Sequence, residues 1–380
     1  MNHIYADHAA TTPVHPEVAD VLVQTLTSSY GNPSSIHGTG REARKILDDA
    51  RTSIARQIGV HFNEIIFTSG GTEADNLAIF GTAESMKSKG NHIITTAVEH
   101  HAVLHPCQEL EKKGYDVTYL PVDQDGKISV DDVRKALRED TILVTVMFGN
   151  NEVGTIQPIE EIGALLKDHQ AVFHTDAVQA FGLLLFDPKE LGIDLFSVSA
   201  HKINGPKGIG FLYAREGISL SPGLFGGEQE RKKRAGTENT AAIAALSKAV
   251  EMAFQNREEK IAELNAIRYA MIEELNSLNV RYEQNGSLED SLPHVLNLSI
   301  HGADVESLLV NLDLEGVAVS SGSACTAGSI EPSHVLSAMF GEGNEKLFNS
   351  IRFSFGYGNT VEDGKKIAQT LKKIMDRFTK

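Results

Sequence analysis

The feature that most constrains the fold is an alternation of short apolar runs with amphipathic stretches between residues 60 and 215. Runs of this kind, separated by helical periodicity, are typical of buried strands in an α/β protein. The alternation predicts an α/β fold with a mostly parallel central sheet, whose ligands bind at the carboxyl ends of the strands. We expect strands near residues 64–68, 92–96, 117–120, 142–146, 171–174, 195–198 and 210–213.

The C-terminal third of the chain reads as a second, smaller unit. A long helical stretch is expected from Thr240 to Leu275, because apolar residues such as Leu264 and Met271 recur at helical spacing. Strand, helix, loop, strand and helix follow it over residues 290–375. We therefore expect a large domain over residues 13–258 and a smaller α+β domain over residues 259–380, which the N-terminal residues 1–12 join.

Charge and hydropathy narrow the possible environments and partners. The formal net charge of −16 argues against direct binding to nucleic acid. The one basic run, Arg231 to Arg234, is more typical of a solvated loop than of a nucleic-acid contact. No stretch of about 18 uncharged apolar residues occurs, and Met1 to Asp7 lack the pattern of a signal peptide. We expect a cytoplasmic protein with no membrane span.

The chain has only 2 cysteines, so it carries no disulfide framework. Cys107 lies in a helical segment and is expected to be a small buried hydrophobe. Cys325 lies in a run of small residues, Ser320 to Ser329, that is typical of a loop. It is either a reactive thiol or an incidental loop cysteine. The 15 histidines are scattered, and no metal site is expected.

Two charged residues at strand ends point to a cofactor with a reactive carbonyl group. Lys202 follows the run 195–198 and lies between His201 and a glycine-rich turn, and Asp176 ends the preceding apolar run. Lysine amines form Schiff bases with carbonyl cofactors when their pKa is lowered. Each residue alone is more typical of a surface charge or a cap. Together they are the minimum equipment for pyridoxal phosphate (PLP), a Schiff-base lysine and an aspartate for the pyridinium nitrogen.

Further residues after strand ends complete a candidate PLP site. The segment Thr68 to Ala74 contains Gly70, Gly71 and Thr72 between a strand and a helix, where free N–H groups bind anions. This signal is weak alone, because many strand–helix turns contain two glycines. Three more residues follow strand ends: His100 could stack on the ring, Gln179 could bond to the phenolic oxygen, and Asn151 could bind the cofactor or a substrate carboxylate.

Several segments of the sequence match those of a known family. The matching segments are Asp7 to Thr12, Gly31 to His37, Arg234 to Asn239, Ser323 to Thr326 and Ile351 to Ser354, in addition to the cofactor residues. The chain resembles the cysteine desulfurases of the class V aminotransferase family, in the branch typified by nitrogenase-associated and general iron–sulfur-cluster desulfurases. The resemblance covers essentially the whole chain and implies a fold-type I PLP-dependent transferase.

The resemblance implies a role for each residue. Lys202 would bind PLP covalently and act as the base, and Cys325 would accept the sulfur. His100 would stack on the ring and transfer protons. Arg352 would bind the substrate carboxylate, beside Asn151. The remaining cofactor contacts would come from Asp176 and Gln179, and from Gly71, Thr72, Ser199 and His201 at the phosphate, with Thr237 contributed by the neighbouring subunit of a homodimer.

The implied reaction removes sulfur from L-cysteine, leaving L-alanine and a persulfide on Cys325. A sulfur-acceptor protein would then receive the sulfur, either an iron–sulfur scaffold or a tRNA thiolation enzyme. A selenocysteine lyase or an aminotransferase of the same family remains an alternative, although a transaminase has no use for Cys325. A non-catalytic sulfur scaffold is disfavoured, because it has no reason to keep Lys202 and Asp176.

Overall fold

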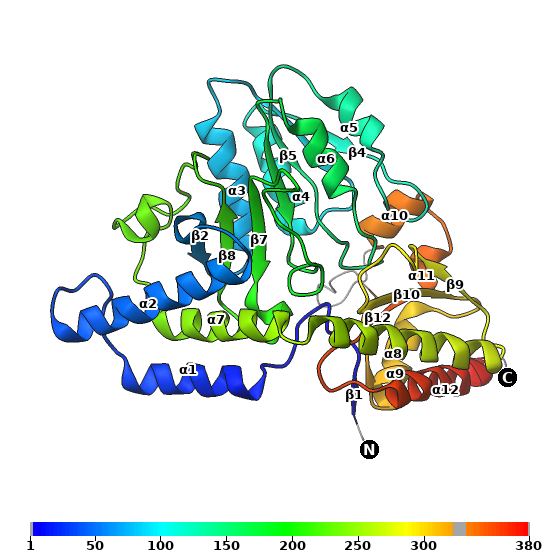
Figure 1. Ribbon diagram of the computed structural model, residues 1–380. Coiled ribbons are helices and arrows are strands. Elements are labelled where there is room, and N and C mark those ends of the chain that lie inside the picture. The colour runs from blue at the N-terminus through cyan, green and yellow to red at the C-terminus, as the bar shows by residue number, and fades with distance from the viewer. Residues whose placement is uncertain (1–2, 322–331, 379–380) are drawn as a thin grey trace.

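A seven-stranded sheet forms the centre of the computed structural model, which describes residues 3–321 and 332–378 (Figure 1). The order along the sheet is β2-β8-β7-β6-β5-β3-β4. Strand β8 runs antiparallel to both neighbours and the other pairs are parallel, which confirms the mostly parallel sheet. The strands are β2 (Ile65–Thr68), β3 (His92–Thr96), β4 (Asp116–Leu120), β5 (Thr141–Thr145), β6 (Val172–Asp176), β7 (Leu195–Ser199) and β8 (Gly210–Ala214).

Helices cover both faces of this sheet. Alternate residues of β8 belong to different cores: Phe211 and Tyr213 pack on one side, and Leu212 packs on the other. Helices α3 (Gly71–Ser85) and α4 (His101–Lys112) cover the Leu212 side. The other side is covered by α2 (Gly38–Gln57), α5 (Val130–Ala136), α6 (Ile159–Leu166) and α7 (Thr240–Phe254), and α1 (Pro16–Ser28) packs on α7.

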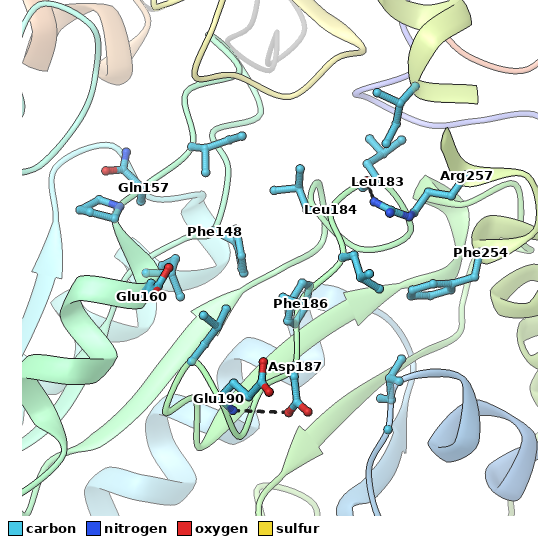
Figure 2. A pocket seen from close by; sticks show the side chains of 18 of the residues that line it. Phe148, Gln157, Glu160, Leu183, Leu184, Phe186, Asp187, Glu190, Phe254 and Arg257 are labelled. Atoms are coloured by element: carbon cyan, nitrogen blue, oxygen red, sulfur yellow. Dashed lines mark hydrogen bonds between the residues drawn. The ribbon is translucent and has the colours of Figure 1, made fainter. Parts of the chain in front are cut away.

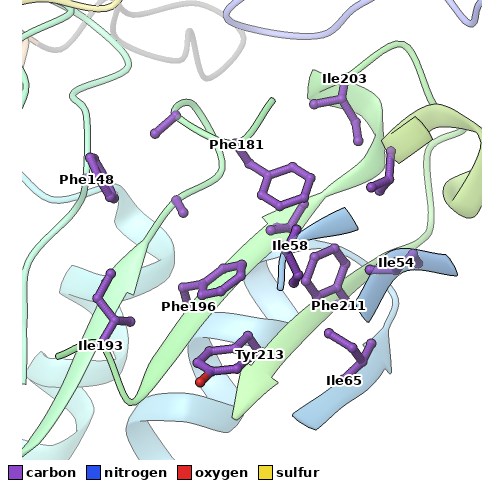
Figure 3. Packing of buried hydrophobic residues seen from close by; sticks show 14 of the residues in the cluster. Ile54, Ile58, Ile65, Phe148, Phe181, Ile193, Phe196, Ile203, Phe211 and Tyr213 are labelled. Carbon is purple, nitrogen blue, oxygen red and sulfur yellow. The ribbon is translucent and has the colours of Figure 1, made fainter. Parts of the chain in front are cut away.

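Aromatic side chains support the strand that leads to Lys202. Phe196 of β7 stacks on Tyr213 of β8 with ring centroids 4.9 Å apart, and Phe181 meets Phe211 edge to face at 5.5 Å (Figure 3). All four rings are at most 2% exposed. Aromatic pairs of this geometry add to the free energy gained by burial. The end of β7 is therefore held in a tightly packed core.

A second sheet lies in the C-terminal part of the chain and has the order β12-β10-β9. Its strands are antiparallel, and β1 (Ile4–Tyr5) pairs beside them with β11 (Val317–Ala318). Figure 1 shows the blue N-terminal strand against this part of the molecule. The elements are β9 (Tyr282–Asn285), β10 (Val295–Ile300), β12 (Ser350–Ser354), α8 (Arg257–Ser277), α9 (Val305–Leu314), α10 (His334–Phe340), α11 (Lys346–Asn349) and α12 (Val361–Phe378).

The helical stretch expected from Thr240 to Leu275 is two helices, α7 and α8, and the expectation of one stretch is wrong at this point. The break lies at Asn256, whose backbone is left-handed with φ 53°. Asparagine adopts this conformation more readily than most residues. The break lets α7 pack on the large sheet and α8 on the small one. No helix within residues 3–321 and 332–378 is long and apolar enough to cross a membrane.

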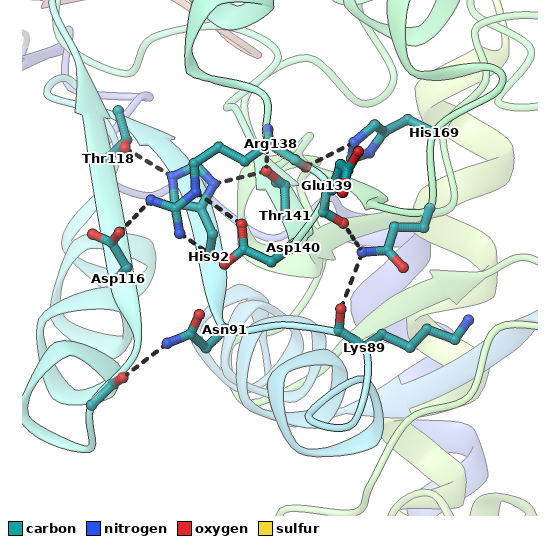
Figure 4. Close-up of polar contacts among 12 residues, drawn as sticks. Lys89, Asn91, His92, Asp116, Thr118, Arg138, Glu139, Asp140, Thr141 and His169 are labelled. Carbon is teal, nitrogen blue, oxygen red and sulfur yellow. Dashed lines mark hydrogen bonds and ion pairs between the residues drawn. The ribbon is translucent and has the colours of Figure 1, made fainter.

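A polar network ties together the amino ends of β3, β4 and β5 (Figure 4). The two ring nitrogens of His92 contact the hydroxyls of Thr141 and Thr118 at 2.7 and 2.9 Å. Arg138 donates to both carboxylate oxygens of Asp140, at 2.9 and 2.8 Å. These contacts fix the amino ends of three neighbouring strands of the large sheet.

Candidate active site

A pocket of about 620 Å³ opens at the carboxyl ends of the strands. Its size is ordinary for a small-molecule site. Residues from both ends of the chain line it, from Ala9 to Arg352. The structure brings most of the predicted site residues together here: Gly71, Thr72, His100, Asn151, Asp176, Gln179, Ser199, His201, Lys202 and Arg352.

The turn between β2 and α3 forms an anion cradle at one end of the pocket. Gly70 has φ 153° and precedes α3, whose start receives no side-chain cap from the described residues. The first N–H groups of α3 therefore remain available to an anion. A Cβ atom on Gly71 would lie 2.8 Å from Val178 Cγ2, so only glycine fits there. Ser199 packs against the same turn.

Asp176 is the last residue of β6 and lies at the floor of the pocket, 6% exposed. Its Oδ1 accepts a hydrogen bond of 2.9 Å from the Val178 N–H. Burial raises the pKa of Asp176 to about 6, against the opposing effects of this bond and of the Lys202 charge. Burial, and then the Asp176 charge, also raise the pKa of the neighbouring Asp75 well above its usual range.

Lys202 ends a short 3₁₀ turn directly after β7. Its Nζ donates to the carbonyl oxygens of Ala9 and Ala10, so the N-terminal segment forms one wall of the lysine site. Burial lowers the pKa of Lys202 to about 8, helped by the charge of Arg352 and opposed by Asp176. A far larger fraction of this amine than of an ordinary lysine is therefore unprotonated near neutral pH, which favours its action as a nucleophile.

His100 and His201 face the pocket as neutral rings. The Nδ1 of His100 accepts a 3.1 Å hydrogen bond from the Ala102 N–H at the start of α4, so the proton of the neutral ring lies on Nε2. Desolvation by the surrounding protein lowers the pKa of His100 to about 4, and the positive charge of Lys202 lowers it further. The His100 side chain nevertheless lines the pocket. Burial, with the Lys202 charge, also lowers the pKa of His201 to about 4.

Arg352 of β12 reaches the pocket from the small sheet and is only 3% exposed. Its Nη2 donates to Asp7 Oδ1 at 2.8 Å, and its Nη1 donates to the Asn151 carbonyl at 2.9 Å. Gln179 lies nearby and donates from Nε2 to the Ala9 carbonyl at 2.9 Å. These contacts hold a rigid guanidinium fork beside the lysine, a geometry suited to a carboxylate ligand.

Among the described residues that the sequence predicts for the site, Thr237 does not line the pocket. Thr237 is exposed on the segment before α7. Cys325 lies outside the described residues. Within the described ranges, no group of three or more His, Cys, Asp or Glu side chains is placed to hold a metal ion.

A larger groove of about 1010 Å³ lies elsewhere on the protein (Figure 2). Apolar side chains such as Phe148, Phe186 and Phe254 line much of it. Its buried Gln157 already bonds to backbone groups of Gly126 and Ile128. The groove thus has the larger volume, but the smaller pocket has the nucleophile, the buried carboxyls and the anion cradle, and it is the better candidate for chemistry.

Sequence reasoning did not assign several residues that shape the pocket. Asp7 contacts Arg352, the carbonyls of Ala9 and Ala10 hold Lys202, and the His294 ring contacts Gln179. The segment Asp7 to Thr12 stood out only as part of the family resemblance. His294 carried no signal, because nothing in the sequence shows which distant residue its ring will meet.

Known proteins resemble this chain along its whole length. The family model described as aminotransferase class-V matches residues 4–367. The "Putative cysteine desulfurase IscS 1" of Bacillus subtilis (strain 168) is 59% identical over 379 residues, which cover 100% of both chains. The "Cysteine desulfurase IscS" of Dictyoglomus turgidum is 48% identical over 375 residues, covering 99% of this chain and 95% of that protein.

A solved structure titled "NifS-like protein" has the same fold. It superimposes with a TM-score of 0.92 at 35% sequence identity, covering 99% of this chain and 100% of that one. This likeness confirms the expected fold-type I architecture. The family match over nearly all residues and the identity to these relatives lead to one conclusion: the chain belongs to the class V aminotransferase family.

Proposed function

We propose that this protein is a PLP-dependent cysteine desulfurase. L-Cysteine and the Cys325 thiol would give L-alanine and a persulfide on Cys325. The observation that carries the proposal is the meeting of Lys202, Asp176 and Arg352 in one pocket. The cysteine desulfurase names of relatives that cover the whole chain support it.

The residues of the pocket fit PLP, the cofactor on which the class V family depends. The Gly70–Gly71 turn accepts an anion, as the phosphate requires, and the buried Asp176 carboxyl suits a positively charged ring nitrogen. The residues that would hold PLP are Gly71, Thr72, Ser199 and His201 at the phosphate, Asp176 and Gln179 at the ring, His100 on the ring face and Lys202 as the covalent anchor.

Bound PLP supplies an electron sink for the loss of a proton from the substrate α-carbon. Arg352 binds the substrate carboxylate through its guanidinium fork, with Asn151 beside it. Lys202, with its pKa lowered to about 8, removes the α-proton, and His100 carries protons between donor and acceptor atoms. The Cys325 thiolate then attacks the substrate sulfur: the S–S bond forms, the C–S bond breaks, and the carbon takes up a proton to become the methyl group of alanine.

The proposal includes a homodimer in which Thr237 reaches the phosphate of the partner subunit. Its exposure, and its position outside the pocket of its own chain, are compatible with this role.

The next recipient of the sulfur would be an acceptor protein, an iron–sulfur scaffold or a tRNA thiolation enzyme. The net charge of −16 favours a tRNA role through such a partner protein rather than by direct binding. The cytoplasmic location stays a prediction.

We also propose the division into a large domain over residues 13–258 and a small domain over residues 259–380 with residues 1–12. The distribution of the buried cores supports it. One core joins α2, α6 and α7 to the large sheet, and a separate core joins α8, α9 and α12 to the small sheet. Ile4 and Ala6 belong to the second core.

The lowered pKa of Lys202 predicts unusual reactivity for this amine in the protein prepared without PLP. Only the neutral amine attacks an acylating reagent, so acetylation of Lys202 should rise with pH and reach half its maximum near pH 8. Mass spectrometry of the digested protein would measure this, with the exposed Lys167 peptide as an internal reference. A midpoint above about pH 10, the ordinary range of lysine, would contradict the account.

Turnover of L-cysteine by the purified protein tests the proposed function. We expect alanine and Cys325 persulfide in equal initial amounts, without any requirement for a keto acid. A keto-acid requirement would instead indicate an aminotransferase. Turnover of L-selenocysteine but not of L-cysteine would indicate a selenocysteine lyase.

A further inference from the structure

One buried histidine beside the small sheet contacts a residue that lines the cofactor pocket but does not line the pocket itself. His294 immediately precedes β10 and is 6% exposed. Its backbone carbonyl accepts a 2.9 Å hydrogen bond from the N–H of Phe355, just after β12. Its ring Nε2 lies 3.0 Å from Oε1 of Gln179. The ring therefore connects the small sheet to a side chain of the PLP pocket.

The surrounding groups fix the orientation of this contact. The Ala9 carbonyl can only accept a hydrogen bond, so the Gln179 atom that faces it is the amide nitrogen. The amide oxygen then faces His294, whose Nε2 must carry a proton to donate to it. One N–H of Gln179 is used by Ala9, and the second remains for a ligand in the pocket that Gln179 lines.

Electrostatics keep His294 in the form that this contact needs. Burial lowers the pKa of His294 to about 3, helped by the charges of Lys260 and His8. The ring is therefore neutral at ordinary pH, with its proton on Nε2 and its bare Nδ1 buried without a hydrogen-bond partner among the described residues. Donation to Gln179 is the one side-chain hydrogen bond that this arrangement provides.

We propose that His294 is a positioning residue that holds the Gln179 amide with its N–H directed into the pocket, toward the phenolic oxygen of PLP. This inference rests on the proposed function. Without the His294 donor, the amide oxygen of Gln179 loses its partner, and the Ala9 carbonyl alone orients the amide, which is then held less firmly. In the fraction of molecules in which the amide rotates, its carbonyl oxygen would face the pocket and repel the phenolic oxygen. Because Arg352 lies on the same small sheet, that sheet would set both the substrate carboxylate site and one cofactor contact.

The test compares PLP binding and the visible absorption of bound PLP in the wild type, His294→Leu and His294→Gln. Leucine fills a similar volume but has no donor, whereas glutamine restores an amide donor near the Nε2 position. We expect His294→Leu to weaken PLP binding by roughly threefold to tenfold, the range for one hydrogen bond, and to shift the pH dependence of the absorption band. His294→Gln should recover most of both properties.

A double-mutant cycle with Gln179→Leu separates positioning from general damage. If His294 acts through Gln179, the His294→Leu change should have almost no further effect on PLP binding when Gln179 is already leucine. Additive effects, or an absorption band and affinity that His294→Leu leaves unchanged, would overturn the inference. A lower melting temperature in His294→Leu with unchanged PLP binding would do the same and would indicate a structural role alone. A wild-type protein that does not bind PLP would instead refute the proposed function itself.

Discussion

Replacing Lys202 with alanine is expected to lower alanine formation from L-cysteine by on the order of a thousandfold. Lys202 is proposed both as the amine that anchors PLP and as the base that removes the α-proton. Its Nζ is held at the pocket by the carbonyls of Ala9 and Ala10, and its pKa of about 8 suits both tasks. Initial rates at saturating PLP and L-cysteine would measure the loss.

The matched control is the same substitution at Lys167, an exposed lysine at the end of α6. Lys167→Ala should keep the wild-type rate. Thermal unfolding should show that both variants are folded, because truncating one partly buried lysine removes no packed core. A Lys202→Ala protein that retains more than about a tenth of the wild-type rate would rule out Lys202 as the base and anchor.

The second large effect concerns the substrate carboxylate. Arg352→Lys is expected to raise the KM for L-cysteine by roughly tenfold to a hundredfold, since a charge-assisted hydrogen bond contributes about 1.5–3 kcal/mol. Lysine keeps the positive charge beside Asp7 but cannot offer two parallel donors. The value of kcat should fall less than kcat/KM, because Arg352 binds the ground state and the transition state alike.

Two measurements separate this effect from a loss of structure. PLP binding to Arg352→Lys should remain close to that of the wild type, because Arg352 is not one of the proposed cofactor contacts. Cysteamine lacks the carboxylate of L-cysteine, so the KM for cysteamine should differ little between the wild type and Arg352→Lys. An unchanged KM for L-cysteine in Arg352→Lys would show that the carboxylate binds elsewhere.

Much of the large sheet could be predicted from the sequence, because its strands are buried on both faces and read as continuous apolar runs. Strand β7 is an example: Phe196 and Val198 stand in an uninterrupted buried run that is followed directly by the turn Ala200–Lys202. The break between α7 and α8 lies in a run of six residues without an apolar side chain, Gln255 to Lys260. This interruption of the periodicity, together with Asn256, which adopts the left-handed conformation there, is the local signal for two helices.

The candidate site was predictable to the extent that its residues follow strand ends. Asp176 ends β6 and Lys202 closely follows β7, and these strands are adjacent and parallel, so the proximity of the two residues follows from the fold class. The contact between Asp7 and Arg352 joins the two ends of the chain, and the contact between Gln179 and His294 joins the two sheets. Local patterns carry no information about such pairings, which depend on how the sheets pack.

The most direct test of the central claim is a single-turnover reaction of L-cysteine with the wild type and with Cys325→Ala, in which alanine and protein-bound sulfur are measured together. The account predicts that the wild type forms alanine and an equal amount of persulfide on the Cys325 peptide. Cys325→Ala should still bind L-cysteine, as a change in the PLP absorption would show, but form almost no alanine. Release of alanine by Cys325→Ala at the wild-type rate would contradict the account, because the sulfur would then leave without this thiol.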